Sequence, residues 1–223
     1  MTVATGTELD VCTFSLDEAE HEVDRLLALL SVDECARAAR FRFSQHRDRF
    51  VVGRGRLREV LGRRTGQHPG SVQFVYGRHG KPELADPVVR FNLSHCDDLA
   101  VLAVCHGCSV GVDLERLRPV ADRELVAERF FSDMEVQALR ALPETRRDAA
   151  FLRCWTRKEA YLKALGGGLS VDLAGFAVSV DSAGASLLWA EDGSELDRWS
   201  VIDLSDHCPG HVAAMVLETR EGS

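Results

Sequence analysis

The chain has 223 residues, which is enough for one or two domains, and hydrophobic residues make up 45% of it, enough for a sizeable core. Its formal net charge of −8 argues against a protein that coats nucleic acid or membrane with its whole surface. No apolar run approaches the roughly 18 residues of a transmembrane helix, and the N-terminal residues do not resemble a signal peptide. We therefore expect a soluble, cytoplasmic protein whose partners include neither membrane nor nucleic acid.

The cysteines argue against an extracellular protein. There are seven of them, an odd number, and they are scattered, so we expect no disulfide framework. The spacing of Cys105 and Cys108 raises the question of zinc, but a second ligand pair at a standard spacing is missing.

The first half of the chain predicts three helices followed by short strands. Residues 17–30 place acids before a leucine stripe, and Ser31 or Asp33 can cap a second helix that runs into Phe41 and Phe43. A third helix is expected over 45–64, ending near Gly66. A glycine-rich turn and two strand-like runs follow, at 76–84, 88–95 and 99–104.

The second half repeats this order approximately. A strand over 109–115 precedes helices near 122–130, 132–141 and 144–165, the last of them stopped by Gly166. Four further runs read as strands: 176–180, 186–190, 199–204 and 211–217. The similar order predicts an α+β fold of two related lobes, with helices against a small antiparallel sheet in each. We place the boundary between residues 1–108 and 109–223, and expect a site in the cleft between the lobes.

Two acids follow each other at i and i+2 on the strand over 109–115. Asp113 and Glu115 should share one face, while Val110, Val112 and Leu114 face the core. Paired carboxylates suit a hard divalent cation such as Mg²⁺. The alternative is an exposed strand face with two solvated acids.

A second cluster lies on the last predicted helix. Trp155, Glu159 and Lys163 share a face at i, i+4 and i+8, and a largely buried Trp155 would turn Glu159 toward the protein. Only three of the 27 basic residues are lysines, and Lys158 and Lys163 are two of them. This favours Glu159 as a metal ligand and Lys163 as a phosphate contact over an ordinary surface ion pair.

Two further segments could meet an anion. Ser94 and His95 end a predicted strand and can hydrogen-bond a phosphate oxygen; the alternative for His95 is a satisfied loop histidine. Residues 37–64 hold ten arginines against Asp48 and Glu59, which indicates either an anion-binding segment or a solvated helix face.

Together these motifs resemble the large, Sfp-type class of 4'-phosphopantetheinyl transferases. Their order and spacing agree with the family from about residue 31 to 180, and they are Gly80-Lys81-Pro82, Phe91-Asn92-Leu93-Ser94-His95, Gly111-Val112-Asp113-Leu114-Glu115 and Trp155 to Lys163. The resemblance implies a monomer of two similar packed lobes related by a pseudo-twofold, the N-terminal one binding coenzyme A and the C-terminal one carrying the metal.

The resemblance also implies the reaction. The 4'-phosphopantetheine of coenzyme A is transferred to a serine of an apo acyl or peptidyl carrier protein, with release of 3',5'-ADP. The cofactor is Mg²⁺, for which Mn²⁺ can substitute, and the setting is polyketide or nonribosomal peptide biosynthesis.

Residue roles carry over position by position. Asp113, Glu115 and Glu159 match the metal ligands, and Glu159 and Lys163 match the catalytic residues. The implied contacts to coenzyme A are Arg37, Arg49, Gly80, Lys81, Pro82, Asn92, Ser94, His95, Asp113, Lys158 and Lys163. Glu34 is an acid where some relatives have a lysine, so the set of residues that would bind the adenosine 3'-phosphate departs from the family pattern.

Two other functions explain part of the sequence. An arginine-rich nucleic-acid-binding protein would use residues 37–64 but would leave Asp113, Glu115 and Glu159 without a role. A metal-dependent phosphohydrolase would use the carboxylates and would consume coenzyme A without any carrier protein.

Overall fold

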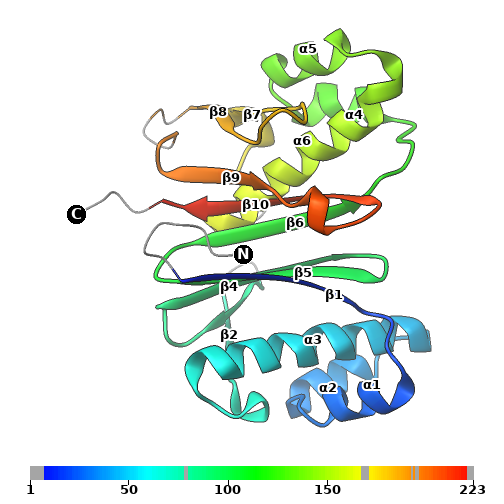
Figure 1. The fold of residues 1–223 in the computed structure, drawn as a ribbon, viewed down its shortest axis with the longest axis vertical. Helices are drawn as coiled ribbons and strands as arrows, with labels where there is room; N and C mark the ends of the chain where they lie inside the picture. Colours follow the sequence, from blue (N-terminus) through cyan, green and yellow to red (C-terminus); the bar gives the residue numbers. More distant parts are fainter. Residues whose placement is uncertain (1–7, 78–79, 167–170, 192, 194–195, 220–223) are drawn as a thin grey trace.

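Two lobes stack on each other, each with a three-stranded sheet and helices on its outer side (Figure 1). The structure is a computed structural model that describes residues 8–77, 80–166, 171–191, 193 and 196–219. The sheets lie at the centre of the molecule, and the helices form its two ends (Figure 1).

The first lobe runs from strand β1 to strand β5. Its elements are β1 (Leu9–Ser15), α1 (Glu20–Leu27), α2 (Val32–Ala38), α3 (Ser44–Thr65), β2 (Phe74–Tyr76), β3 (Pro82–Leu84), β4 (Val89–Cys96) and β5 (Leu99–His106). The antiparallel sheet has the order β1-β5-β4, and β2 and β3 form a separate hairpin.

The second lobe runs from strand β6 to strand β10. Its elements are β6 (Val110–Arg116), α4 (Arg123–Phe130), α5 (Asp133–Ala141), α6 (Glu144–Leu165), β7 (Phe176–Val178), β8 (Leu187–Ala190), β9 (Trp199–Asp203) and β10 (His211–Glu218). The antiparallel sheet has the order β6-β10-β9, and β7 pairs with β8.

The lobes share one topology. Each runs strand, two short helices, a 22-residue helix, a hairpin and two strands, and in each sheet the last strand lies between the first and the one before the last. Both long helices end at a glycine in the left-handed region, Gly66 (φ 68°) and Gly166 (φ 70°). The expected α+β fold of two lobes related by a pseudo-twofold is thereby confirmed.

A common core joins the two sheets. It combines apolar side chains of β5, such as Val101 and Ala103, with Val110, Val112 and Leu114 of β6. The predicted inward face of the 109–115 strand is therefore correct. Beside this core, the side-chain oxygen of Asn92 on β4 accepts the Val112 N–H of β6 at 2.8 Å, a hydrogen bond between the lobes.

The opposite face of β6 is covered by helix α6. A Cβ on Gly111 would lie 2.1 Å from the carbonyl oxygen of Ala160 and 2.4 Å from the nitrogen of Ala164, so only glycine admits the helix at this distance. Asp113 lies on the same face and is buried. The alternative of a solvated strand face is wrong for Asp113.

Local signals account for several helix boundaries. Ser31 and Ser132 begin α2 and α5 with capping boxes to Glu34 and Glu135. Helix α2 ends at Ala38, short of the expected Phe43. The sequence did not reveal β1, nor that the glycine-rich turn joins two strands, β2 and β3.

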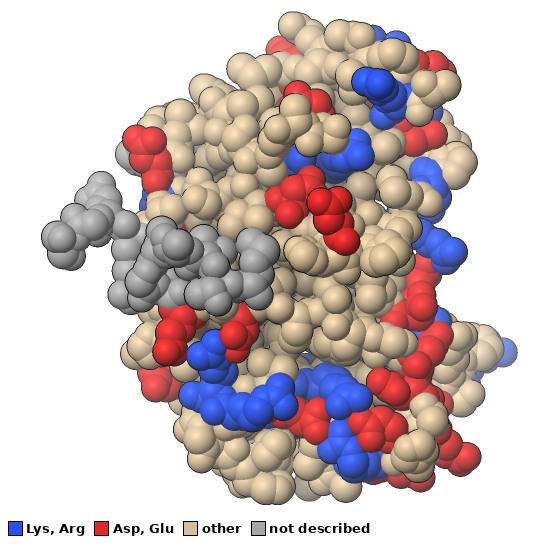
Figure 2. Space-filling model, viewed as in Figure 1, with Lys and Arg blue, Asp and Glu red and all other residues tan. Residues whose placement is uncertain are grey.

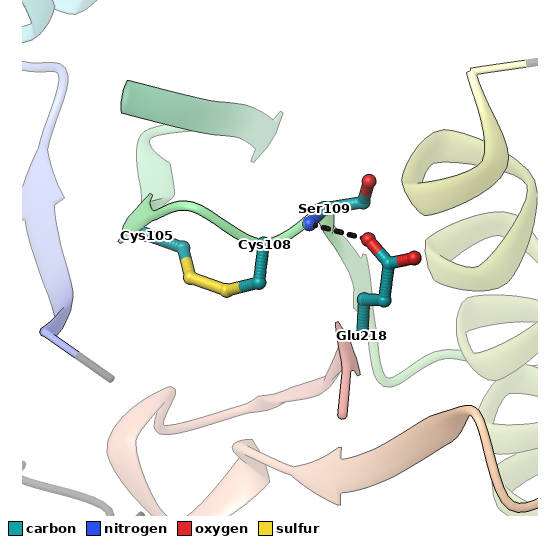
Figure 3. The surroundings of a disulfide bond; sticks show 4 residues. All are labelled: Cys105, Cys108, Ser109 and Glu218. Atoms are coloured by element: carbon teal, nitrogen blue, oxygen red, sulfur yellow. Dashed lines mark hydrogen bonds between the residues drawn. A yellow bond between two sulfur atoms is a disulfide. The ribbon is translucent and has the colours of Figure 1, made fainter. Parts of the chain in front are cut away.

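One cysteine pair departs from expectation. Cys105 and Cys108 form a disulfide, because the turn through Gly107 (φ 74°) brings their Cα atoms to 5.9 Å (Figure 3). The next residue, Ser109, donates its N–H to the carboxylate of Glu218 on β10 (Figure 3). In the described part of the chain no helix combines the length and apolarity needed to cross a membrane.

Candidate functional site

Strands β4 and β6 and helix α6 bring three polar side chains together where the lobes meet. The ammonium of Lys163 donates to a carboxylate oxygen of Asp113 at 2.6 Å and to the hydroxyl of Ser94 at 3.0 Å. The Ser94 hydroxyl also lies 3.0 Å from the same Asp113 oxygen. The sequence had placed these residues in three separate motifs, and it gave no sign that Lys163 pairs with Asp113 rather than with Glu159.

The other oxygen of Asp113 is buried and has no hydrogen-bond partner in the described residues. Near it are Glu115 on the same strand and Glu159 on α6. Burial raises the pKa of both, and the negative charge of Asp113 raises each further, while Lys163 opposes this. An unpartnered buried carboxylate oxygen beside two more acids is a donor set that fits a hard divalent cation.

The carboxylates of Asp113, Glu115 and Glu159 do not form a tight cluster. Their oxygens do not all lie within 4.8 Å of one another. Lys163 instead provides the positive charge beside Asp113, with its side chain 29% exposed.

A cavity of about 660 Å³ opens in the first lobe. It collects seven residues expected to contact coenzyme A, namely Arg37, Arg49, Gly80, Lys81, Pro82, Asn92 and His95. Apolar side chains complete its wall, including Phe41 and Phe50, whose ring centroids are 5.5 Å apart. Arg37 lies over the Phe50 ring at 5.2 Å. The cavity therefore combines cations with flat apolar surfaces.

The turn before β3 connects this cavity to the polar cluster. Gly80 adopts φ 76°, a conformation that favours glycine, and the next residue, Lys81, donates to the carbonyl of Lys163 at 2.6 Å. Burial lowers the pKa of Lys81. Partial burial and then the charges of Lys163 and Arg49 lower the pKa of His95, which favours its neutral form. Both side chains would gain from an anion in the cavity.

Most of the arginines in 37–64 have acidic partners. Arg49 pairs with Asp17, Arg58 with Glu34 and Arg64 with Asp10. Arg47, Arg54 and Arg56 also form ion pairs. On the face shown in Figure 2, basic and acidic side chains of this lobe are interleaved. The segment as a whole is thus not an open anion-binding surface.

Lys158 is not where the family resemblance puts it. Its side chain is fully buried, pairs with the Glu135 carboxylate at 2.7 Å and donates to the Phe176 carbonyl at 2.6 Å. Burial lowers its pKa, and Glu135 opposes this. The expected contact of Lys158 with coenzyme A is therefore wrong in this structure.

For three further residues the structure modifies what the sequence led us to expect. Asn92 lines the cavity, but its oxygen is used by the bond to Val112. Glu34 is buried against Arg58, so this acid does not face the cavity. Trp155 is half-buried and stacks on Phe151 rather than being fully enclosed.

Sequence reasoning missed part of the cavity wall. His46, Phe50, Gly53 and Leu57 all line it from α3. Their spacing of three or four residues is the signature of one helix face and could have identified them.

Matches to known proteins cover both lobes. Residues 109–216 match the model of the 4'-phosphopantetheinyl transferase superfamily, and residues 17–107 match that of the 4'-phosphopantetheinyl transferase N-terminal region. HetI of Nostoc sp., a 4'-phosphopantetheinyl transferase, is 47% identical over 167 residues, which are 73% of this chain and 70% of HetI.

Two Bacillus proteins extend this likeness. The 4'-phosphopantetheinyl transferase psf-1 of Bacillus pumilus is 33% identical over 175 residues, 78% of this chain and 74% of its own. Sfp of Bacillus subtilis is 28% identical over 167 residues, 74% of this chain and 73% of Sfp. On this evidence the chain belongs to the Sfp-type 4'-phosphopantetheinyl transferases.

Proposed function

We propose that this enzyme transfers the 4'-phosphopantetheine group of coenzyme A to a serine of an apo acyl or peptidyl carrier protein, in a Mg²⁺-dependent reaction that releases 3',5'-ADP. We propose further that it acts as a cytoplasmic monomer, with residues 1–108 binding coenzyme A and residues 109–223 carrying the metal and the catalytic helix. Polyketide or nonribosomal peptide biosynthesis is the setting that we assign to it.

The observation that carries this proposal is that the cavity lies next to the Ser94–Asp113–Lys163 cluster. Lys81 lines the cavity and also contacts α6 at the carbonyl of Lys163. A ligand with a flat base, several phosphates and a long flexible arm matches a cavity with aromatic walls and cations that leads to a polar cluster. Coenzyme A has these parts in this order.

Within this proposal, Arg37 and Arg49 meet the phosphate on the adenosine ribose, and Phe41 and Phe50 form the apolar wall for the base. His95 and Lys81 approach the pyrophosphate from the first lobe. Lys163 approaches it from α6 and stabilises the charge that develops on the departing phosphate. Because Lys163 is held by Asp113 and Ser94, it needs little reorganisation when the reaction occurs.

Asp113, Glu115 and Glu159 would hold Mg²⁺. Bound there, the ion would neutralise pyrophosphate charge and act as a Lewis acid. Glu159 is also the residue that we propose as the acceptor of the serine proton. Without metal, burial and then the charge of Asp113 raise the pKa of Glu159, and a cation bound beside it would lower that pKa again.

Coenzyme A turnover with and without an apo carrier protein separates this function from phosphohydrolysis. The proposal predicts that 3',5'-ADP appears only when Mg²⁺ and the carrier are both present. Turnover at the same rate without carrier would instead identify a phosphohydrolase. Tight, salt-sensitive binding to DNA or RNA without any turnover would support the nucleic-acid alternative.

A further inference from the structure

We propose that Cys96, Asp97 and His211 form a second metal site, specific for a borderline-soft transition metal of the Zn²⁺ class, which ties the two lobes together. Their ligand atoms all lie within 4.8 Å of one another, and no other group of three such residues in the described chain meets this condition. The site shares no residue with the carboxylates assigned to Mg²⁺, although Glu115 lies close enough to act electrostatically on Cys96 and Asp97.

The three ligands come from both lobes. Cys96 ends β4, and Asp97 lies in the tight turn to β5. His211 begins β10 in the second lobe, opposite Arg116 of β6. A bound ion would therefore cross-link the turn of one sheet to the central strand of the other.

The hydrogen bonding of His211 prepares the imidazole for a metal. Its Nδ1 lies 3.0 Å from the Pro209 carbonyl oxygen, which can only accept, so Nδ1 carries the proton. The lone pair is then on Nε2, and this atom is buried without a hydrogen-bond partner in the described residues. Histidines that bind metals are commonly oriented in this way by a carbonyl on the other ring nitrogen.

The ligand types decide the metal. A thiolate, an imidazole and a carboxylate are the donors that Zn²⁺ accepts in tetrahedral sites, whereas Mg²⁺ prefers oxygen alone. Three protein ligands leave one position open. Ligands around Zn²⁺ lie about 3–4 Å apart, so the present arrangement needs only small side-chain rotations to close.

Arg116 is the competing group at this site. It pairs with one oxygen of Asp97 at 3.0 Å and gives a backbone hydrogen bond to Cys96. The Arg116 side chain is 61% exposed and the other Asp97 oxygen has no hydrogen bond to it. An exposed ion pair of this kind is weak and does not prevent binding.

Co²⁺ is the probe that tests the site, because thiolate ligation gives it a charge-transfer absorption in the near ultraviolet. The chelator-treated full-length protein is titrated with Co²⁺ in excess Mg²⁺, which occupies the carboxylates. We expect one equivalent to bind with this absorption, Cys96→Ser to abolish the absorption, and His211→Gln to weaken binding at least tenfold. Zn²⁺ should displace Co²⁺ and raise the melting temperature of the wild type more than that of Cys96→Ser.

Matched controls are available in the same chain. Cys12→Ser and His207→Gln should leave the Co²⁺ titration unchanged. The Cys105→Ser/Cys108→Ser double variant should do the same, which excludes these two thiols as the ligands. Absence of Co²⁺ binding, or an unchanged absorption in folded Cys96→Ser, overturns the proposal. Binding that survives Cys96→Ser but is lost in Asp113→Asn overturns it too, and moves the metal to the carboxylates.

Discussion

Lys163 is a side chain on which the two lobes converge, since it contacts Ser94 of β4 and Asp113 of β6 from α6. Lys163→Ala should lower the single-turnover rate by roughly 2–4 kcal/mol of transition-state stabilisation. Lys163→Arg should also lose much of the rate, because a planar guanidinium does not fit the space of a compact ammonium.

The free energy of unfolding is the control measurement for Lys163→Ala. Because Asp113 is buried, Lys163→Ala should cost about 1–2 kcal/mol of unfolding free energy, from the lost charged hydrogen bond. Single-turnover rates at saturating substrates, measured on variants shown to be folded, give the answer. A wild-type rate in folded Lys163→Ala would remove this residue from the reaction.

The titration of Glu159 should be visible in the pH dependence of the protein's stability. Its pKa is raised above the ordinary 4.5, so without metal the folded protein binds its proton more tightly than the unfolded chain does. The stabilisation that protonation provides is complete below pH 4.5 and is lost as the pH rises through the raised pKa. In chelator, Glu159→Gln should therefore be more stable than wild type above this window and equal to it below.

The same substitution should abolish the stabilisation by Mg²⁺. Melting temperatures across pH, with and without Mg²⁺, provide the measurement, and Glu20→Gln, an exposed acid on the first turn of α1, is a control. If Glu159→Gln were no more stable than wild type at neutral pH in chelator, carboxylate crowding at this site would be refuted.

The sequence predicted which residues share a helix face better than it predicted what each of them contacts. The i, i+4, i+8 pattern correctly separates Glu159 and Lys163 as one face of α6. Lys158 lies about 100° from Glu159 and about 140° from Lys163 around the same helix, at 100° per residue, and this geometry turns it into the core. The rarity of lysine in the composition singled out Lys158 and Lys163 equally. The partner of Lys163 could not be predicted, because it depends on how β6 packs against α6.

At the scale of elements, the contact of β6 with α6 sets the geometry of the site. Gly111→Ala should push the helix away from the strand, because the added methyl would lie 2.1 Å from the Ala160 carbonyl. We expect a destabilised protein with little activity, since Asp113 and Lys163 would separate. Gly184→Ala, where a Cβ meets nothing within 4 Å, is the matched control. Normal activity in Gly111→Ala would show that this packing does not position the site.

A second element contact holds α5 to α6. The Lys158–Glu135 pair is fully buried, so Lys158→Ala leaves a buried carboxylate uncompensated and should cost roughly 3–5 kcal/mol of unfolding free energy. Lys158→Met, which keeps the volume but removes the charge, should destabilise the protein for the same reason. Chemical denaturation measures both, and the KM for coenzyme A of the folded enzyme should not change. A raised KM at unchanged stability would restore Lys158 to the cavity.

Helices were predictable to within a few residues where caps and glycines mark their ends, as at Ser132 and Gly166. The strand β1 was not, because its alternation is mixed and its pairing with β5 is set by residues about 90 positions later. The disulfide between Cys105 and Cys108 depends in the same way on the conformation of one turn, which no cysteine count can supply.

At the scale of the whole molecule, the proposed active site exists only because the lobes pack together. The first lobe supplies the cavity and Ser94, and the second supplies Asp113, Glu115, Glu159 and Lys163. The similar order of elements predicted the two lobes, and the family motifs predicted most of the residues that meet. The shared core of β5, β6 and β10 was not predicted, because periodicity shows which side of a strand is buried but not against what.

The central claim is that this combined site transfers phosphopantetheine from coenzyme A to a carrier. The intact mass of an apo acyl or peptidyl carrier protein, incubated with the enzyme, coenzyme A and Mg²⁺, tests it most directly. We predict a gain of one phosphopantetheine on serine with the wild type, none in chelator, and none on the same timescale with Lys163→Ala. An unchanged mass across a panel of apo acyl and peptidyl carriers, with folded enzyme that binds coenzyme A, would contradict the account.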